Sequence, residues 1–371
     1  MMETLTNEQI FKILNRNNID SRGRVKDHHI PLYIPVEPIK GYYLPEFTKN
    51  PNIEDLDNRY DFKIRNKGYR NFAYLLNSYI VRSPQPIIEV NGGTWNQSGN
   101  DDSGPLYSCP PKFPIYPTAI NYGSYTSPHD VSRYELYGRY WSQGASGLLW
   151  IEELDTETRW QTKHRWAFSG VNRTVGEVGL YFRYPVNDGA FWNLIARAII
   201  DPAQEKFADT VYDEGWRITF PSNYTRWFLR AKIHLTVNGP YDLGLPAIAS
   251  DGNTYIIRFV NCFAGNPDVR IGRSNLAPSP THYNLQDPIG ALSSQSQSVE
   301  IDTTLQECRI VRIGTYTPSV NETLGEIGLF TRVYDVGGTS REIMVARGTW
   351  VPTVTLVANT TYTIGIVLRF G

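Results

Sequence analysis

The sequence predicts a mainly β fold with two tandem β-sandwich or jelly-roll domains related by an internal repeat. A short helix and a proline-rich extended arm precede them. The composition combines 13% aromatic residues with 30 Gly and 24 Pro, and aromatic residues suit pleated surfaces while Gly and Pro make turns. Several short segments alternate apolar and polar residues, as half-buried strands do. One motif also occurs twice along the chain, which indicates duplicated units.

The N-terminus has the pattern of a short amphipathic helix. Thr6 to Gln9 fit a capping box, with Leu5 and Ile10 placed as its hydrophobic staple. The apolar residues that follow at helical spacing are Ile10, Phe11, Ile13 and Leu14. We therefore expect a helix at the start of the N-terminal segment 1–85.

A proline-rich arm is predicted after this helix. Proline fixes φ and lacks an N–H donor, so we expect the stretch from His28 to Pro38 to stay out of helices and sheets. Its apolar side chains need a surface, and two remain open: the β domains of the same chain or a neighbouring subunit. The residues expected to dock are Ile30, Leu32, Tyr33, Ile34, Tyr42, Tyr43, Leu44 and Phe47.

An internal repeat divides the rest of the chain. Residues 174–183, TVGEVGLYFR, match residues 323–332, TLGEIGLFTR, at an offset of 149. At an offset of 150, Ala196-Arg197 matches Ala346-Arg347. The offset changes once, at a hairpin rich in Gly and Asp. We therefore expect a first β domain over 86–234 and a second over 235–371.

Each copy has the same predicted layout. A loop of the form Gly-x10-Tyr-x-Leu comes first, and the GE-hydrophobic-GL strand follows. Hairpin turns are expected at 186–189 and 336–339, where Asn, Asp and Gly supply positive φ. In the closing strand, Ile364, Ile366, Leu368 and Phe370 alternate with other residues, which predicts one buried face.

Glu177 and Glu326 occupy the same place in the two copies. Each lies between glycines in a predicted strand, so we interpret each as a carboxylate that accepts hydrogen bonds from backbone or Arg donors at a bulge. No catalytic residue, cofactor site or metal site is expected. Cys109, Cys262 and Cys308 lack the paired spacing of a zinc site.

The paired motif resembles structural proteins of tailed phages and archaeal viruses. Those proteins join a G-T-G-x-x-x-P-x-x-x-D-Y-x-L segment to a later N-E-x-G-L-Y or G-E-x-G-L-Y strand and close on a strand ending in Phe. Here residues 271–285 and 325–330 carry the two elements, and 123–136 is a looser first copy. His282 and Arg133 stand where the family has an acidic residue before the Tyr.

The resemblance covers residues 86–371 and implies a non-enzymatic virion protein at a vertex, tail or collar. Its implied partners are copies of itself in a symmetric homo-oligomer and other virion proteins, near the host-attachment apparatus in one variant of the hypothesis. The implied location is the virion. The N-terminal sequence lacks the pattern of a secretory signal, which predicts a cytoplasmic protein or one released inside a virus particle.

Charge and hydropathy exclude two classes of partner. Lys and Arg number 36 against 37 Asp and Glu, and binding to nucleic acid through phosphate contacts requires an excess of positive charge. No run of about 18 apolar residues is present, so we expect no membrane span.

Carbohydrate binding is the main alternative function. Eight of the nine Trp lie between Trp95 and Trp227, and exposed indoles stack on sugar rings, whereas buried ones fill a core or a subunit interface. Host surface glycans would be the ligand, and a glycan hydrolase using acidic clusters such as 152–157 is a third hypothesis. The candidate glycan contacts are Trp141, Trp150, Trp160 and Trp166.

Two glycosylation sequons are equivalent in the repeat. Asn172 and Asn321 both precede the GE strand, so we expect both at one type of exposed turn where a glycosylating host could modify them.

Overall fold

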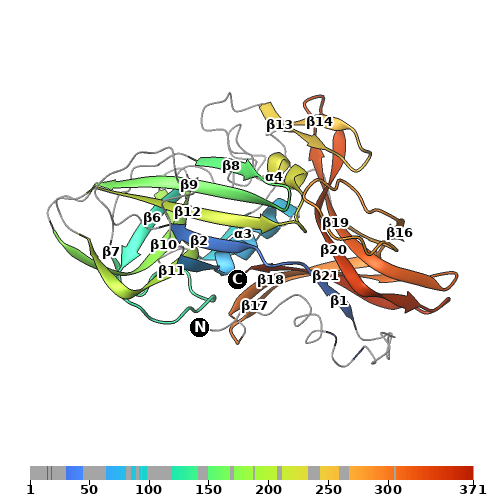
Figure 1. Cartoon of the computed structure of the whole chain (residues 1–371), viewed down its shortest axis with the longest axis horizontal. Coiled ribbons are helices and arrows are strands. Elements are labelled where there is room, and N and C mark those ends of the chain that lie inside the picture. The colour runs from blue at the N-terminus through green and yellow to red at the C-terminus, as the bar shows by residue number, and fades with distance from the viewer. Residues whose placement is uncertain are drawn as a thin grey trace.

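The fold is mainly β, as predicted from the sequence (Figure 1). It is seen in a computed structural model that describes residues 15, 18, 31–44, 64–80, 85–88, 92, 94–97, 118–140, 149–167, 171–186, 189–206, 211–232, 243–258, 267–304 and 306–370. The predicted helix at 6–14 and the arm residues Ile30 and Phe47 lie outside these ranges.

Within the described residues, the N-terminal part contributes three strands, and a first unit of one helix and nine strands follows. The three strands are β1 (Leu32–Pro35), β2 (Lys40–Leu44) and β3 (Ile64–Gly68). The first unit comprises α3 (Arg70–Ile80), β4 (Gln85–Ile88), β5 (Thr94–Gln97), β6 (Thr118–Gly123), β7 (Arg139–Tyr140), β8 (Leu149–Glu153), β9 (Glu157–Ala167), β10 (Arg173–Val186), β11 (Gly189–Lys206) and β12 (Val211–Pro221).

The described part of the second unit has the same order, one helix followed by nine strands. It comprises α4 (Arg226–Lys232), β13 (Leu243–Ile248), β14 (Thr254–Arg258), β15 (Asp268–Gly272), β16 (Pro288–Ala291), β17 (Ser293–Asp302), β18 (Glu307–Tyr316), β19 (Glu322–Tyr334), β20 (Ser340–Leu356) and β21 (Tyr362–Phe370).

Equivalent strands have equivalent neighbours in the two units. In the first, one nine-stranded sheet contains two runs of hydrogen-bonded neighbours, β7-β6-β10-β11 and β12-β9-β8. In the second, the corresponding runs are the sheet β16-β15-β19-β20 and the run β21-β18-β17. The central hairpins match as well, because β10 pairs with β11 down to Val186 opposite Gly189, and β19 pairs with β20 down to Tyr334 opposite Ser340.

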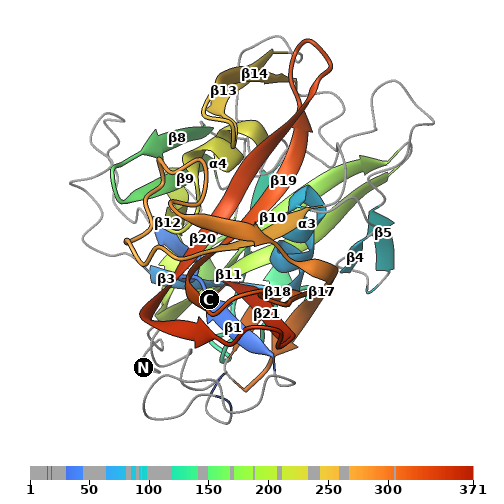
Figure 2. The same cartoon turned by 90° about the vertical axis from the view of Figure 1, so that its right-hand side faces the viewer.

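The arm supplies strands to both units. β2 and β3 lie between β12 and β11, and so join the two runs of the first unit. β1 pairs in parallel with β21 of the second unit, and Figure 2 shows the two side by side. The expectation that prolines keep this stretch out of sheets is wrong, because Pro35 ends an edge strand, where a missing donor is tolerated, and β2 contains no proline.

Described residues of the arm bury their side chains in their own chain. Leu32 and Ile34 are each 1% exposed, and a Cβ placed on Gly348 would lie 3.0 Å from Cγ2 of Ile34. Asn15 binds the outer edge of β1, since its Nδ2 donates to the Tyr33 carbonyl (2.8 Å) and its Oδ1 accepts from the Tyr33 N–H (3.0 Å). Of the two surfaces left open for the arm, these residues occupy that of the same chain.

The segment between the units belongs to the second one. The N–H of Thr225 donates to the Val345 carbonyl (3.1 Å), and that of Arg347 donates to the Asn223 carbonyl (2.8 Å). In the first unit, Tyr69 donates in the same way to the Ile195 carbonyl (2.8 Å). The helix α4 therefore holds the place in the second unit that α3 holds in the first.

Most buried apolar side chains of both units form one contiguous cluster, and Leu285, Phe330 and Met344 form a second, smaller one. The rings of Phe72 in α3 and Phe370 in β21 meet edge to face at 5.3 Å between centroids. β21 differs from its prediction, because Val367 and Arg369 on the face expected to be open are 1% and 0% exposed. β1 lies beside the strand, and Glu307 accepts two hydrogen bonds from Arg369 (2.6 and 3.2 Å).

Truncating Ile34 tests whether the arm is part of the folded chain. We expect Ile34→Ala to lower the free energy of unfolding by about 2–4 kcal/mol, because it leaves a cavity in a packed site. Urea unfolding of the full chain measures this. Val320→Ala, at a side chain 60% exposed, is the control and should cost about 0.5 kcal/mol or less. Equal values for the two variants would show that the arm is not packed in this way.

Candidate functional site

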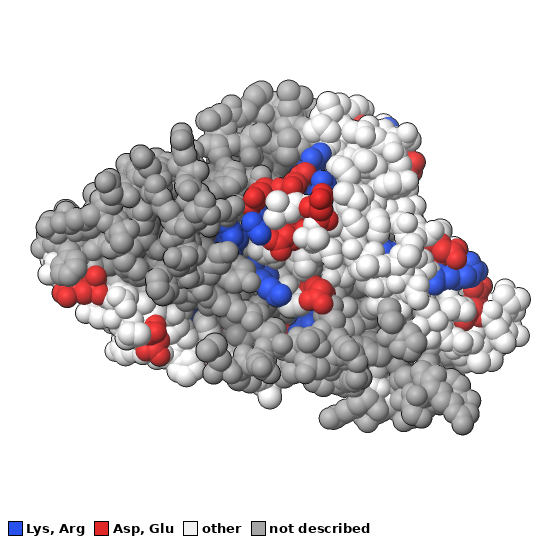
Figure 3. All heavy atoms as spheres, viewed as in Figure 1, with Lys and Arg blue, Asp and Glu red and all other residues white. Residues whose placement is uncertain are grey.

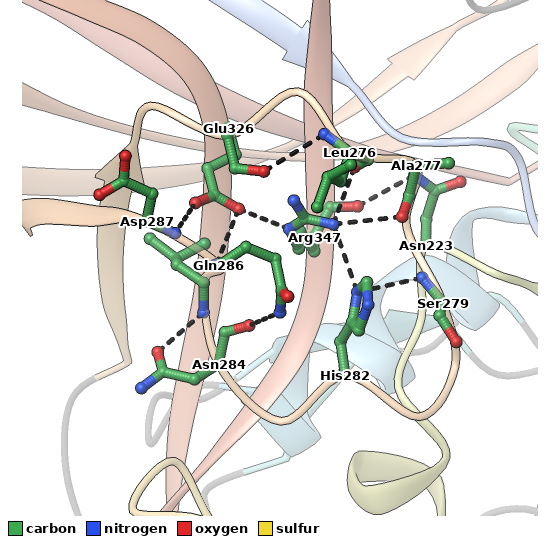
Figure 4. Close-up of polar contacts among 12 residues, drawn as sticks. Asn223, Leu276, Ala277, Ser279, His282, Asn284, Gln286, Asp287, Glu326 and Arg347 are labelled. Atoms are coloured by element: carbon green, nitrogen blue, oxygen red, sulfur yellow. Dashed lines mark hydrogen bonds and ion pairs between the residues drawn. The ribbon is translucent and has the colours of Figure 1, made fainter.

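The second unit contains a buried ion pair that holds a loop in place (Figure 4). Arg347 of β20 donates from Nε to Oε2 of Glu326 in β19 (2.6 Å), and their side chains are 1% and 0% exposed. The carboxylate also accepts the N–H groups of Gln286 (3.2 Å) and Asp287 (2.8 Å). The guanidinium donates from Nη1 to the carbonyls of the other end of the loop, those of Leu276 (3.0 Å) and Ala277 (3.4 Å).

The first unit contains the same arrangement. Arg197 of β11 donates from Nε to Oε2 of Glu177 in β10 (2.7 Å), and both side chains are 0% exposed. Glu177 accepts the Gly138 N–H (2.8 Å), and Nη1 of Arg197 donates to the carbonyls of Ser127 (2.9 Å) and Pro128 (3.2 Å). These loop residues are the equivalents of Asp287, Leu276 and Ala277 at the offset of 149. We call the two arrangements the first and the second loop clamp.

Backbone geometry places each carboxylate. Register shifts interrupt the pairing next to Glu177 and next to Glu326, so each side chain leaves its strand at an irregularity. A Cβ placed on Gly123 or Gly272 would collide with Oε1 of the neighbouring glutamate, so only glycine fits there. The prediction that these glutamates accept from Arg and backbone donors at a bulge is confirmed.

A helix N-terminus secures each loop from a third side. The N–H of Arg70, which begins α3, donates to the Val131 carbonyl (3.0 Å). The N–H of Arg226, which begins α4, donates to the Pro280 carbonyl (2.9 Å). In the first clamp, burial raises the pKa of Tyr69 to about 12, and its hydroxyl lies 3.3 Å from Nδ1 of His129. Each loop is therefore fixed at both ends and near its middle.

His282 distinguishes the second clamp from the first. Its Nδ1 accepts the Ser279 N–H (3.2 Å) and lies 3.2 Å from Nη1 of Arg347. Burial and then the charge of Arg347 lower the pKa of His282, while Glu326 opposes them. The first clamp has Arg133 at this position, and its guanidinium lies over the ring of Tyr137 at 3.7 Å.

The acidic cluster at 152–157 forms ion pairs with α4 and with its own hairpin. Figure 3, viewed as in Figure 1, shows acidic and basic side chains gathered near the middle of the molecule, over α4 and the β8–β9 hairpin. Glu153 accepts Nε and Nη2 of Arg230 (both 2.6 Å), and Arg159 pairs with Glu152 (3.2 Å). Glu153 therefore links the β8–β9 hairpin to α4, and Glu152 links the two strands of that hairpin.

The four candidate tryptophans have different outcomes. Trp160 in β9 is 1% exposed and belongs to the core, so it offers no face to a sugar. Trp150 lies in β8 and Trp166 in β9. Glycan contact by these two residues stays a prediction. Trp141 lies outside the described residues. The structure thus removes Trp160 from the predicted site.

The predicted sequons and arm residues occupy defined places. Asn172 and Asn321 are exposed and directly precede β10 and β19, as the repeat predicts; their glycosylation stays a prediction. Tyr42, Tyr43 and Leu44 pair through their backbones with residues 215–217 of β12. Tyr33 is half-buried in β1.

Two further observations concern the described ranges alone. No helix there combines the length and the apolar character needed to cross a membrane. Among those same residues, His, Cys, Asp and Glu side chains do not gather in threes as ligands for a metal ion.

The arginines of both clamps were absent from the predicted sites. The repeat pairs Arg197 with Arg347, and a buried carboxylate needs a cation. Together these two facts could have identified the arginines as partners of the duplicated glutamates. Another buried pair, Glu307 with Arg369, had no such signal because the first unit has Thr158 and Thr219 at the matching positions.

Neutralising Glu326 tests the second clamp. We expect Glu326→Gln to lower the free energy of unfolding by about 3–5 kcal/mol, since it leaves Arg347 buried without its counter-charge. Chemical denaturation measures this. The control is Glu322→Gln, because the partner of Glu322, Arg273, is 43% exposed; its effect should be close to the limit of detection. If E326Q were as stable as E322Q, the clamp would contribute nothing.

The stability of the fold should fall in acid partly because of His282. Its pKa in the folded chain lies below the ordinary value of 6.5, so at lower pH the unfolded chain binds this proton first and is favoured. We expect the loss of stability between about pH 7.5 and about pH 5 to be smaller in His282→Asn than in the natural chain. Asn Oδ1 can accept the same N–H groups without titrating. Equal losses, measured by urea unfolding, would contradict this role.

Comparison with protein-family models, curated proteins and solved structures finds no match for the chain. A function for this chain is therefore argued from the contacts of the two loop clamps. Residues of the repeated sequence motif, among them Gly272, Leu285 and Glu326, lie in or against the second clamp.

Proposed function

We propose that the chain is a non-enzymatic structural protein of a virus particle, located in the virion at a vertex, tail or collar. In this proposal each unit is one β-sandwich module, and the chain assembles with copies of itself and with other virion proteins. The observation that carries the proposal is the duplicated loop clamp, because Glu326 and the loop residues Leu276 and Ala277 belong to the motif that resembles virion proteins.

The chemistry of the clamps supports a structural role. Glu177 and Glu326 are carboxylates of the kind that serve as catalytic acids or bases. Both are fully buried and are committed to an Arg and to backbone N–H groups of the loop. Their charges therefore hold loop backbone in a fixed shape, which is what a subunit needs to present the same surface to every neighbour.

The joining of the two units supports the same role. The arm pairs with both units, through β1 with β21 and through β2 with β12. Together with the shared core, these pairings make the described chain one body. A net charge of −1 allows like copies to pack without strong mutual repulsion. Closed symmetry is the usual arrangement of such copies, so the proposed assembly is a symmetric homo-oligomer.

Immunogold electron microscopy tests the proposal. Antibodies against this chain, applied to a culture whose genome encodes it, should label virus particles at a fixed position such as vertices or a tail. Pre-immune serum is the control. Label on cell surfaces or free in the medium, with particles unlabelled, would overturn the proposal.

A further inference from the structure

The two clamped loops share a framework but differ in the side chains that they expose. The loops run from residue 124 to 138 in the first unit and from 273 to 287 in the second. Tyr134 and its equivalent Tyr283 belong to the shared framework. Each lies near a hairpin glycine with φ of 83°: a Cβ on Gly92 would be 3.4 Å from the Tyr134 hydroxyl, and one on Gly252 would be 3.4 Å from Cε2 of Tyr283.

Two other tyrosines occur in the first loop alone. Tyr125 is 55% exposed and Tyr137 is 38% exposed, and the second loop has Ser274 and Gln286 in their places. Because the second loop keeps the clamp contacts with Ser and Gln, neither ring is needed to hold the loop. Exposed aromatic rings that the fold does not need are candidates for binding.

Both rings are held in position before any ligand arrives. The Tyr125 ring lies so close to Gly138 that a Cβ there would collide with it; the second loop has Asp287 at that place. Arg133 lies over the Tyr137 ring (3.7 Å from guanidinium carbon to centroid), and buried Arg197 approaches the same ring at 5.0 Å. Little conformational entropy would therefore be lost when a ligand binds to them.

The charges around the rings cancel one another. Glu135 pairs with Arg139 (2.9 Å), and Asp130 accepts the N–H (3.0 Å) and the hydroxyl (2.6 Å) of Ser132. Arg133 donates from Nε to the Glu135 carbonyl (3.2 Å). Over the described residues 124–140, two carboxylates and two guanidinium groups leave no net charge, which favours a neutral ligand over an anion or a cation.

The apolar surface of this loop has the chemistry that sugars require. The large apolar side chains that the described loop exposes are phenol rings, flat and tipped with a hydroxyl, whereas the second loop also exposes aliphatic Leu276 (63%). A phenol face packs on the C–H face of a pyranose, and phenol and guanidinium groups can hydrogen-bond its hydroxyls.

We propose that Tyr125 and Tyr137, with Arg133 beside them, bind a neutral hexose unit of an oligosaccharide on the β6–β7 loop. This site differs from the tryptophan site that the sequence predicted. It goes beyond the proposed role in a particle and does not depend on it, since all of its contacts lie within one folded chain.

Titration of the full chain with neutral oligosaccharides tests the proposal. Isothermal titration calorimetry with maltohexaose, cellohexaose and mannohexaose should detect binding of at least one. The double variant Tyr125→Ser/Tyr137→Gln installs the residues of the second loop, so its backbone contacts have a precedent in the same protein. We expect its affinity to be lower by about tenfold or more, from the loss of two exposed phenol groups.

Two controls accompany the titration. Thermal unfolding should show that the double variant stays folded, and Leu276→Ser, which gives the second loop the residue of the first, should leave the affinity unchanged. Binding of none of the three sugars, or equal binding by the double variant, would overturn the proposal. A double variant that changes self-association and not sugar binding would also overturn it and would assign the rings to a contact between copies. Particle labelling is read separately, so failure here leaves the proposed function standing.

Discussion

A carboxylate with no exposed surface must find its hydrogen-bond donors within the protein, and this need governs the course of both loops. A buried charge without partners costs several kcal/mol. Glu326 meets the requirement with Arg347 and two loop N–H groups, and Arg347 in turn needs acceptors, which it finds at the other end of the loop. Moving either end would leave a charge unsatisfied, so the pair specifies one loop conformation.

This constraint explains why the motif contains the residues it does. Glycine precedes each loop because the glutamate side chain occupies the space of a Cβ there. Leu285 and its equivalent Leu136 are only 5% and 2% exposed. Their side chains lie against the glycines of the GE-hydrophobic-GL strands. Other loop positions differ between the two units. The first loop has Tyr125 and Tyr137, and the second has Leu276 and His282.

The candidate sites were only partly predictable. Glu177 and Glu326 could be interpreted from the repeat, because two copies of one carboxylate between glycines point to structure. Trp160 could not be placed, since an indole suits a core and a binding face equally until burial is known. Tyr125 and Tyr137 were not identified, because the chain has 24 Tyr and only the tertiary structure shows that both rings are exposed on one clamped loop.

The amino-acid sequence alone determined the β class, the duplicated motif, and the Arg and backbone donors from which its glutamates accept hydrogen bonds. These are local properties, set by side-chain periodicity, turn residues and a motif that recurs. Only the tertiary structure decided that β1 pairs with β21, that α4 opens the second unit, and which arginine meets which glutamate. Such contacts join segments far apart in the chain, and burial, not local propensity, selects among the partners available for each strand and each charge.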